Sequence, residues 1–404
     1  MAYYLRFDKG NLAMQAVVLF VFLFSCLPVL NSQEYKVVYK QIPDNRGTEF
    51  VVGFLQQFKQ ELDGATRLFI TSDYNTRVVI TARHTNVRKE IDIKARQLYP
   101  VDFPTSIRMK GTKVEGKGIH IKADSEVVVY GLNIKKFTTD AFLALPVDIQ
   151  STKYIIPSFT PSYTSLIGII AIYDRTTIFV TFNFADRKSF FRFRGRSYRH
   201  RDTLSVTLSR LRTLQIAHTK DMTGTRIFST KPISVLSGNE CANVPKEKGY
   251  CDHLVEHIPP VNTWGQRFIT APLAGRQGGD FFRIMAANRS TDVRINGKYI
   301  ETLDEGKFIE VDVPSNRYQY IETSKPCIVV QYSKGQKVDN TFTDPFMIMI
   351  PPVEQYTAQY TISTPDQNEQ YFNSFINIII DTKQIDGLRV DGRSLRDEKW
   401  VPVW

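Results

Sequence analysis

A proline that follows an apolar residue, and then at a fixed distance an aromatic residue, recurs four times along the chain of 404 residues. The aromatic residue follows the proline after seven positions in the first copy and after eight in the other three. The prolines are Pro43, Pro146, Pro260 and Pro352, and the aromatic residues are Phe50, Tyr154, Phe268 and Tyr360. Such a repeat indicates that one supersecondary unit is copied and packed against its neighbours, which excludes most folds built on a single core.

Two further elements follow each aromatic residue in the same order. The first is a strand, a tight turn and a second strand, as at residues 169–172, 174–176 and 178–180. The second is an apolar strand that closes the copy, at residues 125–131, 231–235 and 325–330. No fourth closing strand precedes Trp404, so we expect a fragment of a longer protein. The predicted repeats are 43–145, 146–258, 259–350 and 351–404, the last incomplete.

The apolar runs inside each copy are four to seven residues long and predict β-strands. They are rich in Val, Ile, Phe, Tyr and Thr and are bounded by Asn, Asp, Gly and Pro. A unit of about 100 residues with six or seven strands suits a β-sandwich, whereas a propeller blade has only about 40–50 residues. We therefore predict an all-β fold of tandem β-sandwich-like repeats, with a propeller-like arrangement of β repeats as the alternative.

The N-terminal segment predicts the compartment. Arg6 and Lys9 precede an apolar run at residues 16–30, which as a helix would rise only about 22 Å, less than the ~30 Å of a bilayer core. This pattern favours a secretory signal peptide at 1–32, leaving a secreted, extracellular chain of residues 33–404. An uncleaved signal anchor is the alternative. No later apolar run is long enough to span a membrane, so we expect no transmembrane segment in the mature chain.

Three cysteines remain after such cleavage, in a compartment where disulfides persist. Cys241 and Cys251 are ten positions apart and enclose the turn-forming residues Asn243, Pro245 and Gly249, so we predict a disulfide between them. Cys327 is then unpaired. It lies in an apolar strand and is interpreted as a buried small hydrophobe, with an intermolecular disulfide as the alternative.

A basic segment is the most unusual charge feature of a chain whose formal net charge is +11. Seven cations occur between Arg187 and Arg201, and Phe191 and Phe193 alternate with arginines as in a strand with one apolar face. Guanidinium groups suit sulfate and carboxylate groups, so the segment is a candidate anionic-glycan site. A solvated hairpin whose charges serve solubility is the favoured interpretation of the sequence alone. In a secreted chain we expect no nucleic-acid partner. The predicted ligand-binding residues are Arg192, Arg194, Arg196, Arg199 and Arg201.

Three motifs resemble catalytic sites but lack the required context. Residues 253–257 read H-x-x-E-H, but Pro259 and Pro260 prevent the helix that a zinc peptidase needs. Residues 111–117 read G-x-x-x-x-G-K, but Gly118 replaces the hydroxyl residue of a P-loop. The acidic pair at 304–305 precedes a glycine and predicts a turn. We therefore expect no enzyme, no catalytic residues, no metal site and no cofactor.

One sequon, Asn288-Arg289-Ser290, lies in a predicted turn and makes Asn288 a candidate glycosylation site.

The segment around the cysteine pair resembles the N-terminal domain of the IgGFc-binding protein family. The resemblance rests on residues 237–245 and 249–256, followed by Ile258-Pro259-Pro260 and Trp264-Gly265, and on residues 138–146, 223–227 and 331–335. It covers roughly residues 35–404. His257 stands where the family pattern has Gln, the arginine-rich segment is not a family hallmark, and no von Willebrand D modules follow.

The resemblance implies a secreted, non-catalytic binding or scaffold protein, associated with mucus or matrix, that recognises glycoproteins or anionic glycans. The alternative is a structural, adhesive matrix component that self-associates without a small ligand. Binding to the Fc part of IgG is not carried over, because no Fc-contacting residues can be matched.

Overall fold

The computed structural model of the protein describes residues 4–7, 44–58, 64–82, 86–135, 138–339, 343–363 and 375–403. Within these ranges almost every element is a β-strand, and the helices are 3-10 turns of three to six residues. The prediction of an all-β fold is confirmed. None of the helices in the described ranges has the length and apolar character that crossing a bilayer would require.

Unit 1 extends from β2 to β9 and is built around one strand of 17 residues, β8 (Ile119–Lys135). The first part of β8 pairs with β2 and β4, and its second part pairs with β3 and β9. β5 then pairs with β4, and β6 with β3. One long strand thus runs through both sheets of a sandwich-like unit. The other strands are β2 (Gly47–Val52), β3 (Ala65–Thr71), β4 (Thr76–Ala82), β5 (Val87–Ile93), β6 (Tyr99–Phe103) and β9 (Thr138–Leu143).

Unit 3, from β20 to β26, has the same strand order around β25 (Gln319–Ser333). The first part of β25 pairs with β20 and β22, and its second part pairs with β21 and β26. Pro326 lies between the two parts, where its missing N–H removes no ladder bond. The remaining strands are β20 (Gly265–Thr270), β21 (Asp280–Ala286), β22 (Thr291–Ile295), β23 (Lys298–Leu303), β24 (Phe308–Val313) and β26 (Met347–Ile350).

Unit 2, from β10 to β19, repeats this order with the long strand broken into β17 and β18. β17 pairs with β10 and β12, and β18 pairs with β11 and β19. Pro232 stands directly before β18, as the sequence predicts for a proline at a strand start. The main strands are β10 (Lys153–Ile155), β11 (Ser165–Ala171), β12 (Thr176–Thr181), β15 (Thr203–Leu208), β16 (Thr213–His218), β17 (Arg226–Ser229), β18 (Ile233–Ala242) and β19 (Asp252–His257).

The aromatic residues of the sequence motif explain why each unit starts in the same way. Phe50, Tyr154 and Phe268 lie in the first strands β2, β10 and β20 and have at most 1% of their surface exposed. Burying such a side chain contributes about 2–3 kcal/mol to folding, so each anchors the first strand of its unit. We propose that the three units are the structural counterparts of the predicted repeats.

A fourth sheet has the order β27-β1-β28-β29. β27 (Gln359–Thr361), β28 (Leu388–Val390) and β29 (Arg393–Ser394) hold the positions of the first, third and fourth strands of units 1 and 3. The position of the long strand is held by β1 (Tyr4–Phe7), which is antiparallel to both β27 and β28. Apart from β1, the predicted signal peptide lies outside the described residues, so its cleavage stays a prediction.

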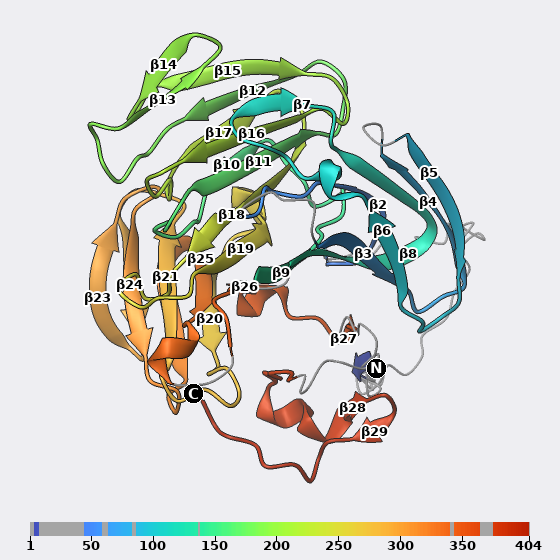
Figure 1. The fold of residues 1–404 in the computed structure, drawn as a ribbon. Coiled ribbons are helices and arrows are strands. Elements are labelled where there is room, and N and C mark those ends of the chain that lie inside the picture. The colour runs from blue at the N-terminus through green and yellow to red at the C-terminus, as the bar shows by residue number, and fades with distance from the viewer. Residues whose placement is uncertain are drawn as a thin grey trace, which may run out of the picture.

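The three units follow one another in an arc, with β27–β29 and the N-terminus on the remaining side (Figure 1). β7 (Lys113–Glu115) of unit 1 pairs with β16, so the first two units share a sheet. Residues of both units form one core around Leu68, Ile170 and Leu236, and a second core between units 2 and 3 includes Phe159, Trp264 and others. Apolar cores therefore extend across both interfaces.

Candidate ligand-binding site

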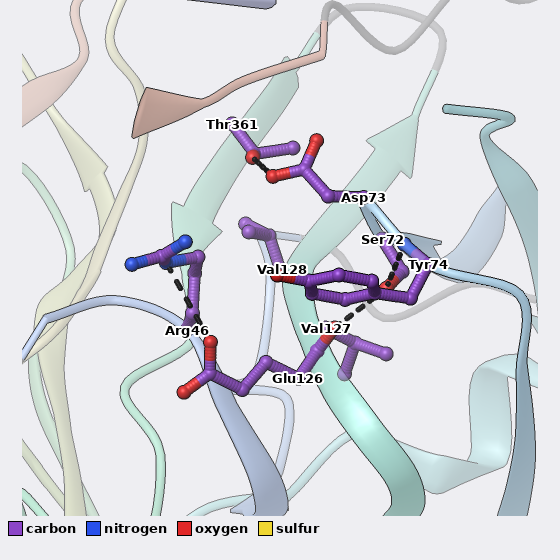
Figure 2. A pocket seen from close by; sticks show the side chains of 8 residues that line it. All are labelled: Arg46, Ser72, Asp73, Tyr74, Glu126, Val127, Val128 and Thr361. Atoms are coloured by element: carbon purple, nitrogen blue, oxygen red, sulfur yellow. Dashed lines mark hydrogen bonds and ion pairs between the residues drawn. The ribbon is translucent and has the colours of Figure 1, made fainter. Parts of the chain in front are cut away.

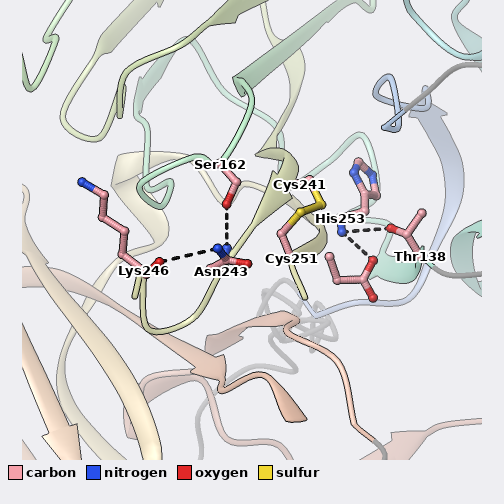
Figure 3. The surroundings of a disulfide bond; sticks show 8 residues. Thr138, Ser162, Cys241, Asn243, Lys246, Cys251 and His253 are labelled. Carbon is pink, nitrogen blue, oxygen red and sulfur yellow. Dashed lines mark hydrogen bonds between the residues drawn. A yellow bond between two sulfur atoms is a disulfide. The ribbon is translucent and has the colours of Figure 1, made fainter. Parts of the chain in front are cut away.

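The predicted disulfide between Cys241 and Cys251 is present, with the two Cα atoms 5.2 Å apart (Figure 3). It closes a loop that unit 3 also contacts. Gly335 N–H donates to the carbonyl of Val244 at 2.7 Å, and the Lys337 ammonium lies 4.5 Å from the ring centre of Tyr250. The disulfide loop therefore fastens unit 2 to the segment that follows β25.

The basic segment forms a hairpin, which we call the arginine hairpin: β13 (Phe190–Phe193) and β14 (Arg196–Arg199), inserted between β12 and β15. Arg194 and Gly195 make its turn with φ of 49° and 78°, the left-handed pair that a tight two-residue turn requires. Unit 3 connects the corresponding strands β22 and β23 through Asn296 and Gly297 alone. The arginine hairpin is thus an addition to the repeated unit.

Three aromatic side chains attach the arginine hairpin to the core of unit 2. Phe191, Phe193 and Tyr198 each have 7% of their surface exposed. The Phe191 ring packs edge-on against Phe182 at 4.7 Å, and Tyr198 lies 6.1 Å from the same ring. The predicted alternation of buried rings and exposed arginines is therefore observed in β13. The buried rings fix the position of the backbone that carries the arginines.

The five arginines are exposed, but they do not share one face. Arg192 pairs with Ser197 and therefore lies on the face opposite the rings, as does Arg199. The guanidinium of Arg194 lies 5.2 Å from the Phe193 ring centre, and that of Arg196 lies 5.1 Å from that of Tyr198. Arg201 follows in the turn before β15 with φ of 70°.

In the described part of the chain, none of the five side chains forms an ion pair with a carboxylate. Two buried arginines of unit 3 behave differently, since Arg283 and Arg276 both bind aspartates. Unpaired guanidinium groups above aromatic rings retain their donors for an external anion.

The H-x-x-E-H segment is the strand β19, so its histidines are structural. His257 accepts a hydrogen bond at Nδ1 from Leu145 N–H at 2.9 Å, and its Nε2 lies 3.1 Å from Ser234 Oγ. The Nε2 atom of His253 lies 3.2 Å from Asn133 Nδ2. Burial lowers the pKa of His253 to about 4 and that of His257 to about 3, so both rings are neutral.

The other motifs also have structural roles. The Lys117 ammonium binds the carbonyl of Arg108 and lies 3.0 Å from Glu115, next to β7, so it is used in contacts within the protein. Cys327 is a free, fully buried thiol whose pKa burial raises to about 12. The predicted buried position is therefore observed, and an intermolecular disulfide would first require this core to open. Asn288 is exposed in the turn between β21 and β22.

A shallow pocket lies where unit 1 meets β27 (Figure 2). The Asp73 carboxylate accepts hydrogen bonds from Thr361 Oγ1 at 2.7 Å and from Gln359 Nε2 at 3.2 Å. Arg46 binds Asp44 at 2.7 Å. These charged groups are used in contacts within the protein, so the pocket is a junction between segments and a poor candidate for a ligand site.

Sequence reasoning missed a buried arginine with many polar partners, Arg283 in β21. Its guanidinium donates to Asp221 at 2.8 Å and to Glu310 at 2.7 Å, and lies between the rings of Phe159 and Phe308 at 4.7 and 4.5 Å. A single arginine inside an apolar strand was the available signal.

Buried acids near β19 predict a pH-dependent stability. Burial raises the pKa of Asp252 to about 8, so the folded state binds more protons than the unfolded state between about pH 4 and 8, and stability falls as pH rises through that window. His253 and His257, whose pKa values are lowered, oppose this trend only below about pH 6.5. We therefore expect the free energy of unfolding to fall between pH 6.5 and 8.5.

Urea titrations at several pH values measure this fall, which should be shallower in Asp252→Asn. The exposed Asp304→Asn is the matched control and should keep the wild-type slope. An equal fall in all three proteins would contradict the assignment to Asp252.

Comparison with known proteins gives one family. The family described as "IgGFc binding protein" matches residues 140–404. The human IgGFc-binding protein is 25% identical over 358 residues, which make up 86% of this chain and 6% of the human protein. The chain thus spans a small fraction of that relative.

Solved structures add little. An anti-sigma factor domain-containing protein aligns at 10% identity over 75% of this chain and 82% of its own, with a TM-score of 0.15. A GH78 family rhamnosidase of Bacillus sp. GL1 aligns at 8% identity over 76% of this chain and 53% of its own, with a TM-score of 0.14. Neither similarity carries an argument about this fold.

Proposed function

This chain belongs to the IgGFc-binding protein family, and from that premise we propose that it is a secreted, non-catalytic protein that binds anionic glycans or glycoproteins of mucus or matrix. The family is one of binding proteins. The finer assignment rests on one observation, the addition of the arginine hairpin to a unit that is otherwise repeated without it.

The chemistry of the arginine hairpin favours sulfate and carboxylate groups. Each guanidinium offers a planar fork of donors that matches two oxygens at once, and Arg194 and Arg196 are held above rings that limit their motion. The aromatic base fixes the backbone, so less side-chain and loop entropy is lost when an anion binds. A hairpin that served solubility alone would not need this base.

Glycosylation at Asn288 is part of the proposal. The sequon occupies an exposed turn on unit 3, where an attached glycan would meet no buried surface. An extracellular route is the condition for this modification.

Replacing Arg192, Arg194 and Arg196 together by alanine is expected to abolish retention of the protein on immobilised heparin or sialylated mucin at physiological salt. Three contacts to anionic groups of the glycan would be lost. By analogy with other polyanions, the slope of the logarithm of the binding constant against the logarithm of the salt concentration should therefore become shallower by about three. The salt concentration at which the protein elutes measures retention, and titration calorimetry at several salt concentrations measures the slope.

The matched control replaces Arg289, Arg294 and Arg317, three exposed arginines of unit 3, and removes the same charge. It should bind nearly as the wild type does. Equal losses in the two triple variants would mean that net charge alone causes retention. Human IgG Fc is a second probe, and hairpin-dependent binding to Fc without binding to glycans would contradict the proposed ligand class.

A further inference from the structure

The outer surface of one sheet of unit 2 differs from the corresponding surfaces of the other units. The sheet has the order β10-β17-β12-β15, and Ile178, Val180 and Val206 point into the core. The side chains on the other side of β12 and β15, together with Phe228 of β17, form what we call the hydroxyl face. Its members are Thr177, Phe179, Thr181, Thr203, Ser205, Thr207 and Phe228.

Two phenylalanine rings occupy the middle of the hydroxyl face. Phe179 and Phe228 are directly paired across β12 and β17, with ring centres 6.2 Å apart and planes 28° from parallel. Phe228 has 53% of its surface exposed. Leaving two such rings partly in water costs free energy, so a pair of this kind on a flat sheet marks a surface that binds something.

Hydroxyl groups surround the ring pair on the side of β15. The Oγ1 atoms of Thr177 and Thr207 are 2.9 Å apart, and so are those of Thr181 and Thr203. Each hydroxyl can donate once and accept twice, so such a pair still offers acceptors and one donor to a ligand. The side chains of β12 and β15 on this face carry no charge.

The corresponding surface of unit 1 is charged. There Glu90 of β5 forms ion pairs with Arg77 of β4 and with Arg88 of its own strand. Charged side chains are the usual protection of an edge strand, and β15 is an edge strand without them on this face. The repeated architecture therefore does not require the hydroxyl face to be uncharged.

The hydroxyl face ends at the arginine hairpin. Thr203 and Thr181 are paired at the end of the sheet from which the hairpin chain enters and leaves, and Arg201 N–H donates to the carbonyl of Phe182 there. Arg201 is four residues from Ser205, so these two residues lie at most roughly 13 Å apart along the strand. Ser205 in turn pairs with Phe179 of the ring pair. An extended ligand can reach both surfaces.

On the opposite side the hydroxyl face is bounded by unit 3. Glu305, in the turn before β24, lies 3.1 Å from the guanidinium of Arg226 and 3.6 Å from the Lys153 ammonium. The two cations nearest the rings on that side are thus neutralised. On the side of the arginine hairpin, by contrast, the arginine side chains are not neutralised by carboxylates in the described part of the chain.

We propose that the hydroxyl face is a sugar-stacking subsite, on which a pyranose ring of the glycan covers Phe228 while its sulfate or carboxylate groups bind the arginine hairpin. This inference rests on the proposed function and names its substrate class: an acidic polysaccharide, and not a polyanion without sugar rings. The C–H side of a pyranose ring is apolar and suits an aromatic face, and its hydroxyl groups suit the threonine pairs.

The test compares a heparin hexasaccharide with inorganic polyphosphate by titration calorimetry, using the whole protein. Phe228→Ala should weaken hexasaccharide binding about fivefold or more and leave polyphosphate binding within twofold of the wild type, because only the sugar stacks. The loss should persist at 0.5 M salt, where ionic contributions are screened. Phe228→Trp should retain binding, and Tyr299→Ala, which removes an aromatic ring with 48% exposure on unit 3, is the matched control.

The outcomes separate this inference from the proposed function. If the arginine triple variant loses both probes but Phe228→Ala binds the hexasaccharide normally, the stacking subsite is wrong and the anion site stands. If the triple variant loses neither probe, the proposed function is wrong. If the wild type sediments as a dimer that Phe228→Ala dissociates, the hydroxyl face is an interface between copies, and the inference is overturned.

Discussion

Arg283→Ala is expected to lower the free energy of unfolding by about 3–5 kcal/mol, because it leaves a buried carboxylate without its partner. The side chains of Arg283 and Asp221 have 3% and 6% of their surface exposed, and the two belong to units 3 and 2. Arg283 also donates to Thr223 Oγ1 and to the carbonyl of Ser158 in unit 2. One substitution therefore removes the hydrogen bonds of Arg283 to Ser158, Asp221 and Thr223 across that interface.

Chemical unfolding followed by tryptophan fluorescence measures the effect. Arg294→Ala, on the neighbouring strand β22 and exposed, is the control and should change stability by less than about 0.5 kcal/mol. If Arg283→Ala does not fold, the double variant Arg283→Met with Asp221→Asn keeps the question open to measurement. It should be more stable than Arg283→Met alone, since no buried charge is left unpaired.

Replacing Cys241 and Cys251 together by alanine is expected to cost about 2–3 kcal/mol, the chain entropy of a loop with ten-residue separation. The loss should extend beyond the loop itself, because Val244 and Tyr250 inside it contact unit 3. We expect hydrogen exchange to become faster both in the loop and at residues 335–338.

Lys246→Ala, an exposed change inside the intact loop, is the control for local perturbation. Lys337→Ala tests the contact with Tyr250 and should cost about 0.5–1 kcal/mol. Unchanged exchange at 335–338 in the cysteine variant would show that the loop and unit 3 are held together by other contacts.

The sequence predicts where most strands lie, but it does not predict which strands pair with one another in a sheet. Short runs such as those around Phe50 and Tyr154 have the composition and period of strands and form β2 and β10. The apolar run at residues 376–380, which has the same composition, does not form a strand. The sequence does not indicate that a single strand, β8, belongs to two sheets. Its middle residues, Ser125 and Glu126, resemble the residues of a turn. The side-chain pattern is local, whereas the sharing of a strand depends on partners far along the chain.

The candidate site shows the same division. The alternation of Phe191 and Phe193 with arginines is a local pattern, and it predicted the buried and exposed sides of the arginine hairpin. The pairing of Phe179 with Phe228 is not local, since the two rings belong to strands 49 residues apart. The ion pair between Arg283 and Asp221 could not be predicted from the sequence either, because only the fold brings these two residues together.

The fourth sheet has a consequence for the order in which the protein assembles. Each of the three units is made from one continuous stretch, so its contacts can form as soon as that stretch has left the ribosome. β1 instead pairs Leu5 with Tyr360 and with Val390, partners from the other end of the polypeptide. Because β1 lies within the predicted signal peptide, cleavage would remove the strand that joins β27 to β28. The three units should therefore assemble without this sheet, and its remaining strands should be the first to open under stress.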